Sequence, residues 1–427
     1  MIPRDPNQLL MLVGALIVVV EAIAIVYARP PAGAWLLAAA AVAGTYSQPR
    51  GVVVGDFQVY VMDVVTLVLV CVVVLKLIQR PSLPRPIVIL VGLSALALAR
   101  GAAEFETQTA VNATRGLLPL IVAVGFACVC LKRNTWDIVQ RLLYWSAAVY
   151  LVSAVVFVAR HGLGTYASSG ERALAAAPAL VVGQAGILAL VTPGARWLKL
   201  YAMVCLVTLL VSEQRTVWGA TLACAIVIAI GSGRLVNRRV ARSVRLGLVA
   251  SGFALVALLT AGPSSLQRSL TQATSTASTD SGTLGWRVEG WASLLNTYKA
   301  KPIEDKFVGQ PFGSGFARTI DRQLITVSPH NMYITVLLSL GAIGLASLVV
   351  MFAAACRRAA SSSIPLLAVV VGLLVFSVGY QLFSIEGLVI GAALTYSTQP
   401  DSVTRVRISR SRESLADPEP ADRVPTV

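Results

Sequence analysis

The chain has 427 residues, of which 56% are hydrophobic and only 13% charged, and its mean hydropathy is +0.76. Because soluble domains are about 45–50% apolar and about 25% charged, this composition excludes an ordinary soluble enzyme and predicts a membrane protein. The apolar runs do not alternate, so they predict spanning helices of about 20 residues rather than spanning strands. The net charge of +15 indicates membrane topology rather than nucleic-acid binding, because Arg and Lys gather in short connections between apolar runs.

The N-terminal half contains long apolar runs that predict spanning helices, among them residues 9–27, 59–77 and 142–158. The first run is long for the apolar part of a signal peptide and further runs follow, so we expect it to be retained. Residues 35–46 are short and rich in alanine, and whether they cross decides the side on which the N-terminus lies. All six cysteines fall in or beside apolar runs, which predicts neither a disulfide framework nor a zinc site.

The strongest orientation signal is residues 234–245, where five arginines stand between two apolar runs and therefore predict a cytoplasmic connection. Counting spans from there places the other basic connections on the same side. The connections near Glu104, near His161 and at residues 212–215 fall outside. The next apolar run, residues 246–259, then leads out into a long external loop.

The predicted fold is an all-α integral membrane protein of about 12 transmembrane helices with one long external loop bearing short amphipathic helices. Residues 364–396 are long for one span and are interrupted near residues 379–387, which predicts two short helices. The predicted organisation is a bundle of transmembrane helices at residues 1–262, an external (periplasmic-side) loop at 263–329, C-terminal transmembrane helices at 330–397, and a disordered cytoplasmic tail at 398–427.

The external loop changes character along its length. Residues 264–283 are rich in Ser and Thr, whereas residues 286–298 have aromatic and apolar side chains at helical spacing, as at a membrane interface. Residues 309–316, Gly-Gln-Pro-Phe-Gly-Ser-Gly-Phe, favour tight backbone turns but lack the lysine and the spacing of a phosphate-binding loop.

Two arginines on the predicted external side are candidate anion ligands. Arg215 begins an apolar helix, a depth at which ionisable side chains are rare unless they face a cavity or a partner, and a guanidinium there suits a lipid-linked phosphate. The alternative is an interfacial arginine paired with Glu213. Arg287 lies at the start of the amphipathic stretch. It is either a second ligand of the same anion or an arginine that pairs with Glu289 or with solvent.

His330 is the candidate general base. With Ser328 as a helix cap and Pro329 as the first helical residue, we expect His330 in the first turn of the returning helix, whose positive end favours a neutral imidazole. A neutral imidazole can accept a proton from a hydroxyl group. A single histidine is more often a packing residue, and this is our expectation for His161.

The motifs of the loop and its flanking helices occur in one order: Gln214-Arg-Thr-Val-Trp218, Trp286-Arg287 with Trp291 one turn later, residues 309–316, and His330-Asn331 followed by Gly341-Ala-Ile-Gly344. This order, over roughly residues 212–345, resembles the O-antigen ligase/O-antigen polymerase family of C-type glycosyltransferase-like membrane proteins. Each motif is short and degenerate, so their order around one loop carries the resemblance.

The resemblance implies a membrane enzyme that transfers a glycan from a polyprenyl-diphosphate carrier to a hydroxyl of a glycan or lipid-glycan acceptor, with inversion. It implies catalytic roles for Arg215 and Arg287, which would bind the diphosphate, and for His330, which would activate the acceptor hydroxyl. It implies neither metal nor cofactor, and it places the protein in the bacterial inner (plasma) membrane with its site on the periplasmic or extracellular side. Further substrate contacts are expected from Arg115, Gln214, Trp286 and Asn331.

Several alternatives remain open at this stage. Glu104 and Glu106 are either a metal-binding acidic pair or, more simply, ion-pair partners of Arg100 and Arg115. A multi-spanning transporter or flippase of lipid-linked glycans would also have many helices with a few ionisable residues, although such proteins usually show repeated halves. A non-catalytic scaffold would leave the conspicuous Arg and His residues without a role. The sequence does not separate a ligase from a polymerase, nor does it identify the sugar, linkage or acceptor.

Overall fold

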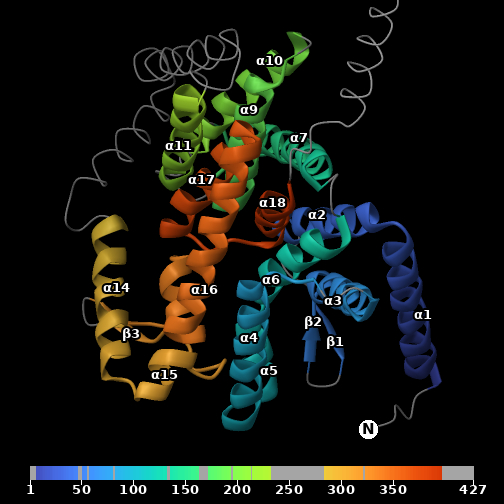
Figure 1. Cartoon of the computed structure of the whole chain (residues 1–427), viewed down its shortest axis with the longest axis vertical. Coiled ribbons are helices and arrows are strands. Elements are labelled where there is room, and N and C mark those ends of the chain that lie inside the picture. Colours follow the sequence, from blue (N-terminus) through green and yellow to red (C-terminus); the bar gives the residue numbers. More distant parts are fainter. Residues whose placement is uncertain are drawn as a thin grey trace, which may run out of the picture. The chain divides into compact units, whose positions relative to one another are not determined.

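The computed structural model describes residues 6–46, 51–54, 57–79, 82–131, 135–162, 172–193, 196–212, 214–231, 283–320 and 323–396. All of them belong to one compact unit, Met1–Tyr396. Within these residues the structure is mainly helical, and the strands form two short antiparallel hairpins, β1–β2 and β3–β4 (Figure 1). The predicted cytoplasmic connection at residues 234–245, the predicted helix at 246–259 and the predicted tail lie outside the described residues.

The described elements are, in chain order, α1 (Pro6–Ala28), α2 (Pro30–Tyr46), β1 (Val52–Val54), β2 (Phe57–Val59), α3 (Val61–Gln79), α4 (Arg85–Glu104), α5 (Thr107–Thr114), α6 (Leu118–Phe126), the π-helical turn η1 (Ala127–Leu131), α7 (Thr135–His161), α9 (Ala176–Val191), α10 (Arg196–Val211), α11 (Arg215–Gly231), α14 (Thr283–Ala300), α15 (Ile303–Val308), β3 (Arg318–Ile320), β4 (Gln323–Ile325), α16 (Met332–Ser362), α17 (Ile364–Gly379) and α18 (Ser384–Thr395). Helices α1, α3 and α7 cover the first predicted runs. Helix α14 covers the predicted amphipathic stretch, and α17 and α18 are the two short helices predicted near the C-terminus.

Four of the described helices, α3, α4, α7 and α16, are long and apolar enough to cross a membrane. The pair Thr107–Thr114 and Leu118–Leu131, bent by 50°, makes a fifth if it forms a single broken span. Helices α9, α11, α17 and α18 are apolar but shorter. These features identify a multi-pass membrane protein, whereas the number of 12 spans and the external position of the loop stay predictions.

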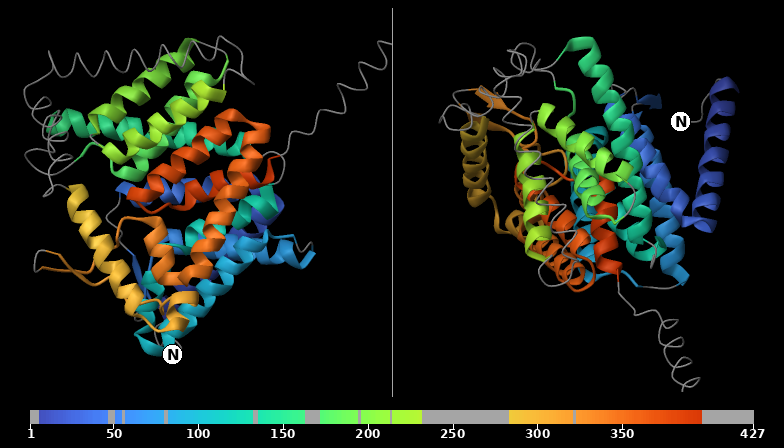
Figure 2. Two further views of the ribbon diagram at one scale, coloured as in Figure 1. Left: turned by 60° about the vertical axis from the view of Figure 1, so that its left-hand side comes forward. Right: turned by 90° about the horizontal axis from the view of Figure 1, so that it is seen from above.

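Helix α18 forms the centre of the described bundle. Its residues from Ser384 to Leu394 are all buried, and it contacts α2, α6, α7, α16 and α17 (Figure 1). Small residues permit its close approach to α6 and η1, since a Cβ at Gly391 would overlap the Cβ of Ala127. In contrast, α1 contacts only α2 and α3 among the stronger helix pairs and lies at the edge of the bundle in Figure 1 and in the right-hand view of Figure 2.

Helix α16 is interrupted by a kink at Gly341, where φ is 69° and ψ is −172°. This conformation is natural only for glycine, and a Cβ here would also overlap the carbonyl group of Phe307 in α15. Gly341 therefore permits the close approach of α15 to α16. The kink sets the direction of the first turns of α16, which follow His330.

The glycine-rich stretch 309–316 lies between α4 and α16, and it forms the tight turns that the sequence predicts. The N–H of Gln310 donates to the carbonyl of Leu338 beside the kink (3.0 Å), and the N–H of Phe312 donates to the carbonyl of Ala97 (2.9 Å). These bonds satisfy backbone groups that would otherwise be buried without partners. Positive φ values occur at Gly309, Gly313 and Gly315.

Arg100 ties α4 to the same stretch. Its Nη2 pairs with Asp305 Oδ1 (2.8 Å), and its Nη1 donates to the carbonyl of Gly309 (2.8 Å). The ion pair predicted between Arg100 and Glu104 is therefore wrong, because the fold brings a carboxylate of α15 closer than the exposed glutamate at the end of α4. The predicted external connection near Glu104 thus lies beside the segment that leads to α16.

Candidate active site

His330 lies in the turn before α16, outside the helix. The N-cap of α16 is Asn331, whose Oδ1 accepts the N–H of Ile334 (3.0 Å). The prediction that Ser328 caps this helix and that His330 sits in its first turn is therefore wrong. The physical reason is that the Ser328 Oγ has other partners, since it accepts from Nε2 of Gln381 (2.8 Å) and from the N–H of His330 (3.4 Å) in the turn before the helix.

The backbone of His330 is in the left-handed region, with φ of 51°. For a residue with a Cβ, such a conformation costs about 1–2 kcal/mol, and the surroundings must hold it. The Nε1–H of Trp291 donates to the carbonyl of Pro329 (2.8 Å), and Gln381 holds Ser328 two residues before the histidine. A strained residue fixed on both sides is typical of a functional position, so the turn directs the imidazole rather than merely starting a helix.

Arg287 and His330 meet at one aromatic ring, that of Tyr380 at the end of α17. The guanidinium of Arg287 lies 4.9 Å from the ring centre, and the imidazole of His330 contacts the same ring edge to face with centroids 5.9 Å apart. Arg287 also donates from Nη1 to the carbonyl of Gly379 (3.3 Å) and from Nη2 to Tyr380 Oη (3.3 Å). Within the described residues, Arg287 forms no ion pair with Glu289, and its Nε is buried without a hydrogen-bond partner.

Gln214 joins this group from the side of α11. The residue is buried, and its Oε1 accepts from Arg172 Nη1 (3.0 Å) and, over a longer distance, from Tyr380 Oη (3.5 Å). Its Nε2 donates to the carbonyl of Leu174 (3.0 Å). Tyr380 therefore connects Gln214 on one side with Arg287 on the other.

Arg215 stands at the first position of α11, next to Gln214. The C-terminal end of α17 packs directly on the following residue, because a Cβ at Gly379 would lie 2.7 Å from Cγ2 of Thr216. Since Arg287 binds the carbonyl of Gly379, the two predicted catalytic arginines flank the same end of α17. Glu213, the alternative partner of Arg215, lies outside the described residues.

Arg318 is a further cation in this region, and sequence reasoning missed it. It lies on β3 with 5% exposure and donates from Nη1 to the carbonyls of Phe316 (3.0 Å) and Val327 (2.8 Å). Its guanidinium lies 5.7 Å from the ring centre of Trp286. Carbonyl and aromatic partners orient the group but leave its positive charge uncompensated. No sequence signal distinguished it, because one arginine in a three-residue strand resembles an exposed hairpin residue.

The electrostatic environment favours the neutral form of His330. Burial lowers the pKa of the imidazole below its usual value, and the charges of Arg287 and Arg318 lower it further. The predicted direction is confirmed, although burial and two arginines cause it rather than a helix end. Cations that attract an anion thus stand beside an imidazole that is free to accept a proton.

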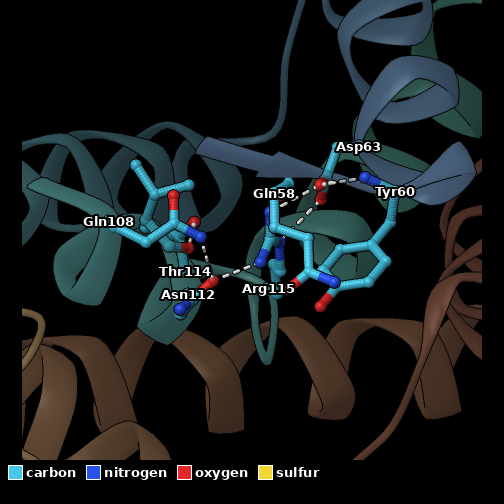
Figure 3. A network of polar contacts seen from close by, with 8 residues as sticks. Gln58, Tyr60, Asp63, Gln108, Asn112, Thr114 and Arg115 are labelled. Atoms are coloured by element: carbon cyan, nitrogen blue, oxygen red, sulfur yellow. Dashed lines mark hydrogen bonds and ion pairs between the residues drawn. The ribbon is translucent and has the colours of Figure 1, made fainter. Parts of the chain in front are cut away.

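Arg115 belongs to a separate polar network, which joins it to Asp63, Gln58 and Asn112 (Figure 3). It forms two contacts with Asp63, from Nη2 to Oδ2 (2.7 Å) and from Nε to Oδ1 (3.0 Å). Its ion pair is therefore with Asp63 and not with Glu106, so that part of the predicted pairing is wrong as well. Its role as a phosphate contact stays a prediction, and its remaining contacts are with Gln58, Tyr60 and Asn112.

A cavity of about 310 Å³ lies between these two networks. It is bounded by α5, the stretch 309–316, the first turns of α16, and the residues Ser328 and Gln381, which hold the turn of His330. The described residues thus bring His330, Arg287 and Gln214 together, place Trp286 under Arg318, and use Asn331 as a helix cap. Arg115 does not line the cavity, but Asn112, to which it donates, does.

A comparison with known families matches the part of the chain that contains most of these residues. Residues 200–349 match the family model described as O-Antigen ligase, and this span contains Gln214, Arg215, Arg287 and His330. No curated protein matches the chain. The family implies transferase activity on glycans in the membrane. The family predicted from the order of the loop motifs is therefore confirmed for the domain at residues 200–349, which matches the O-antigen ligase family model.

Proposed function

We propose that the protein is a metal-independent, inverting glycosyltransferase that moves a glycan from a polyprenyl-diphosphate carrier to a hydroxyl acceptor. The observation that carries this proposal is the meeting of His330 and Arg287 at Tyr380. A proton acceptor and an anion ligand at one point are what the attack of a hydroxyl and the departure of a diphosphate require. The reaction would take place at the outer face of a bacterial plasma membrane.

The reaction follows from the roles of these groups. The imidazole of His330 takes the proton of the acceptor hydroxyl while its oxygen forms a bond to the anomeric carbon of the donor sugar. The bond from that carbon to the diphosphate oxygen breaks, and the leaving diphosphate takes the electron pair. Arg215 and Arg287 stabilise its charge, so no acid is needed to protonate the leaving group.

The charge of the site supports a reaction without a metal ion. Arg287 and Arg318 both act on His330, and the carboxylate nearest to Arg287 in the chain, Glu289, is exposed. A divalent cation would be repelled by these guanidinium groups, whereas a diphosphate needs such groups in its place. Bidentate guanidinium groups are well suited to this anion.

The decisive experiment uses the purified full-length chain in detergent or nanodiscs, with a polyprenyl-diphosphate-linked oligosaccharide, candidate acceptors and EDTA. We expect transfer in the native protein and its loss in both His330→Ala and Arg215→Ala. The chain has only one other histidine, His161, at the end of α7, so His161→Ala is the matched control and should stay active. The length of the product then distinguishes a ligase from a polymerase.

Two outcomes would contradict the proposal. Transfer that is unaffected in His330→Ala would remove the assignment of the base. Movement of the labelled lipid-linked glycan across a liposome membrane, with no new glycosidic bond for any acceptor, would instead identify a transporter or flippase.

A further inference from the structure

The cavity between α5 and α16 differs in chemical character from the cluster formed by Arg287 and Arg318 beside His330. None of the residues that line it is charged. Hydroxyl and amide groups come from three different elements, and two aromatic rings complete the wall. The polar and aromatic lining residues that matter here are Thr109, Asn112, Gln310, Phe312, Phe316 and Gln381.

This lining fits an uncharged sugar ring. A pyranose presents hydroxyl groups that both donate and accept hydrogen bonds, and it presents apolar C–H faces that pack on aromatic rings. The volume of about 310 Å³ is at the lower end of the range for small-ligand sites. A phosphate group, in contrast, would find no cation in this lining.

The position of the cavity relative to His330 indicates whether it binds a sugar of the donor or of the acceptor. Ser328 and Gln381 line the cavity and bond to each other (2.8 Å), and each is close in sequence to a residue of the catalytic cluster, His330 or Tyr380. Arg287 and Arg318 do not line it. The reacting sugar of the donor is bonded to the diphosphate and must therefore lie beside the arginines, so the ring that enters this cavity belongs to the other substrate.

We propose that the cavity binds the terminal, uncharged pyranose of the acceptor and presents one of its hydroxyl groups to His330. The proposal rests on the proposed glycosyltransferase function, and it adds the location and the chemical class of the acceptor subsite. It also gives the network of Figure 3 a role. Arg115, held by Asp63, donates to Oδ1 of Asn112, so it is a positioning residue for one wall of the cavity.

The main test fills the cavity without disturbing the core. Ala113 lines the cavity from α5 and its side chain is exposed, so Ala113→Trp places an indole in the space for the sugar. The matched control is Ala103→Trp in the last turn of α4, which is also exposed but does not line the cavity. We expect the KM for the acceptor to rise at least tenfold in Ala113→Trp only, with the KM for the polyprenyl-diphosphate donor within twofold of the native value.

A second, smaller substitution tests the same cavity with less risk of misfolding. Thr109→Val keeps the side-chain shape and removes one hydroxyl from the lining, while Thr107→Val makes the same change at an exposed residue outside it. We expect the KM for the acceptor to rise several-fold in Thr109→Val and to stay unchanged in Thr107→Val. Unchanged acceptor KM values in both Ala113→Trp and Thr109→Val, or an increase in the donor KM instead, would overturn the proposal.

Binding without turnover separates this proposal from the one on which it rests. In the His330→Ala background, we expect an acceptor oligosaccharide with an uncharged terminal pyranose to bind in isothermal titration calorimetry, and Ala113→Trp to abolish that binding. Transfer activity that survives His330→Ala would refute the catalytic assignment alone. Binding that survives Ala113→Trp would refute the acceptor subsite alone.

Discussion

Tyr380 links the proposed base to the proposed anion ligand, and its replacement tests this link in two steps. Tyr380→Phe removes the hydroxyl, which accepts from Arg287 Nη2 (3.3 Å) and donates to Gln214 Oε1 (3.5 Å). It keeps the ring that contacts Arg287 and His330 and that stacks on Phe376 with centroids 5.1 Å apart. Tyr380→Leu removes both the hydroxyl and the ring.

The expected magnitudes follow from these contacts. Hydrogen bonds to charged groups contribute about 1.5–3 kcal/mol at normal length, but the two bonds of Tyr380 are long, so we assign about 1 kcal/mol to their loss. This value corresponds to about a fivefold decrease in kcat/KM for Tyr380→Phe. Loss of the cation–π contact and of the edge-to-face contact adds about 2 kcal/mol. Tyr380→Leu should therefore reduce kcat/KM about a hundredfold.

The assay is transfer from the polyprenyl-diphosphate-linked donor, with kcat and KM determined for each substrate. The loss in Tyr380→Leu should fall on kcat and on the KM for the donor, because the tyrosine holds the anion ligand and the base. Equal, small effects of both substitutions would show that the ring does not orient Arg287 and His330. A loss in Tyr380→Phe as large as that in Tyr380→Leu would show instead that the hydroxyl itself takes part in the reaction.

Three further predictions concern charge, capping and the kink. Since protonated His330 cannot accept a proton, the rate should fall as the pH drops through its lowered pKa. Arg318→Gln removes a charge that lowers this pKa, so it should move the acidic limb of the pH–rate profile to higher pH, whereas Arg318→Lys should leave the limb in place. Asn331→Ala should lower the free energy of unfolding by about 1 kcal/mol through loss of the N-cap of α16, measured by thermal unfolding in detergent, and Asn331→Asp should restore it. Gly341→Ala should cost at least about 2 kcal/mol in the same measurement, because a Cβ overlaps the carbonyl of α15 at a positive φ, while Gly14→Ala in α1, which meets no atom within 4 Å, should be neutral or slightly stabilising. Unshifted acidic limbs, or equal stability of each pair, would contradict these assignments.

The helices were predictable because the bilayer leaves the chain few alternatives. Backbone groups in hydrocarbon must be satisfied within the segment, so a long apolar run is read directly as a helix, as α1, α3 and α7 show. The break near Gly379 was also visible, because it separates two apolar stretches that are together too long for one span. Which helices cross, and the arrangement around the central α18, depend on packing that hydropathy does not encode.

The site was predictable only in part. The order of the sequence motifs along the chain identified Gln214, Arg287 and His330. The fold brings these three residues into contact with Tyr380. The start of α16 was misplaced because Ser328 and Asn331 are both good N-caps, and a distant side chain decides between them.

The contributions of Tyr380, Arg172 and Arg318 were not visible in the sequence. Each acts through a partner from another helix or loop, and a single sequence gives no information on such pairs. Tyr380 follows α17, yet its contacts are with residues of α14, of the turn before α16 and of the segment before α11. Only the tertiary structure brings these segments to one point.

The partners of the arginines separate two functions that the sequence alone does not separate. Arg100 and Arg115 each pair with a carboxylate, Asp305 and Asp63, so their charges are compensated and they fix the positions of backbone segments. Arg287 and Arg318 have carbonyl and aromatic partners, and within the described residues neither forms an ion pair. Such partners hold a guanidinium in place without neutralising it, at the cost of keeping an uncompensated charge partly buried. An anion bound between them would offset that cost, so Arg287 and Arg318, together with Arg215 at the same end of α17, mark the place where we expect the diphosphate of the proposed reaction.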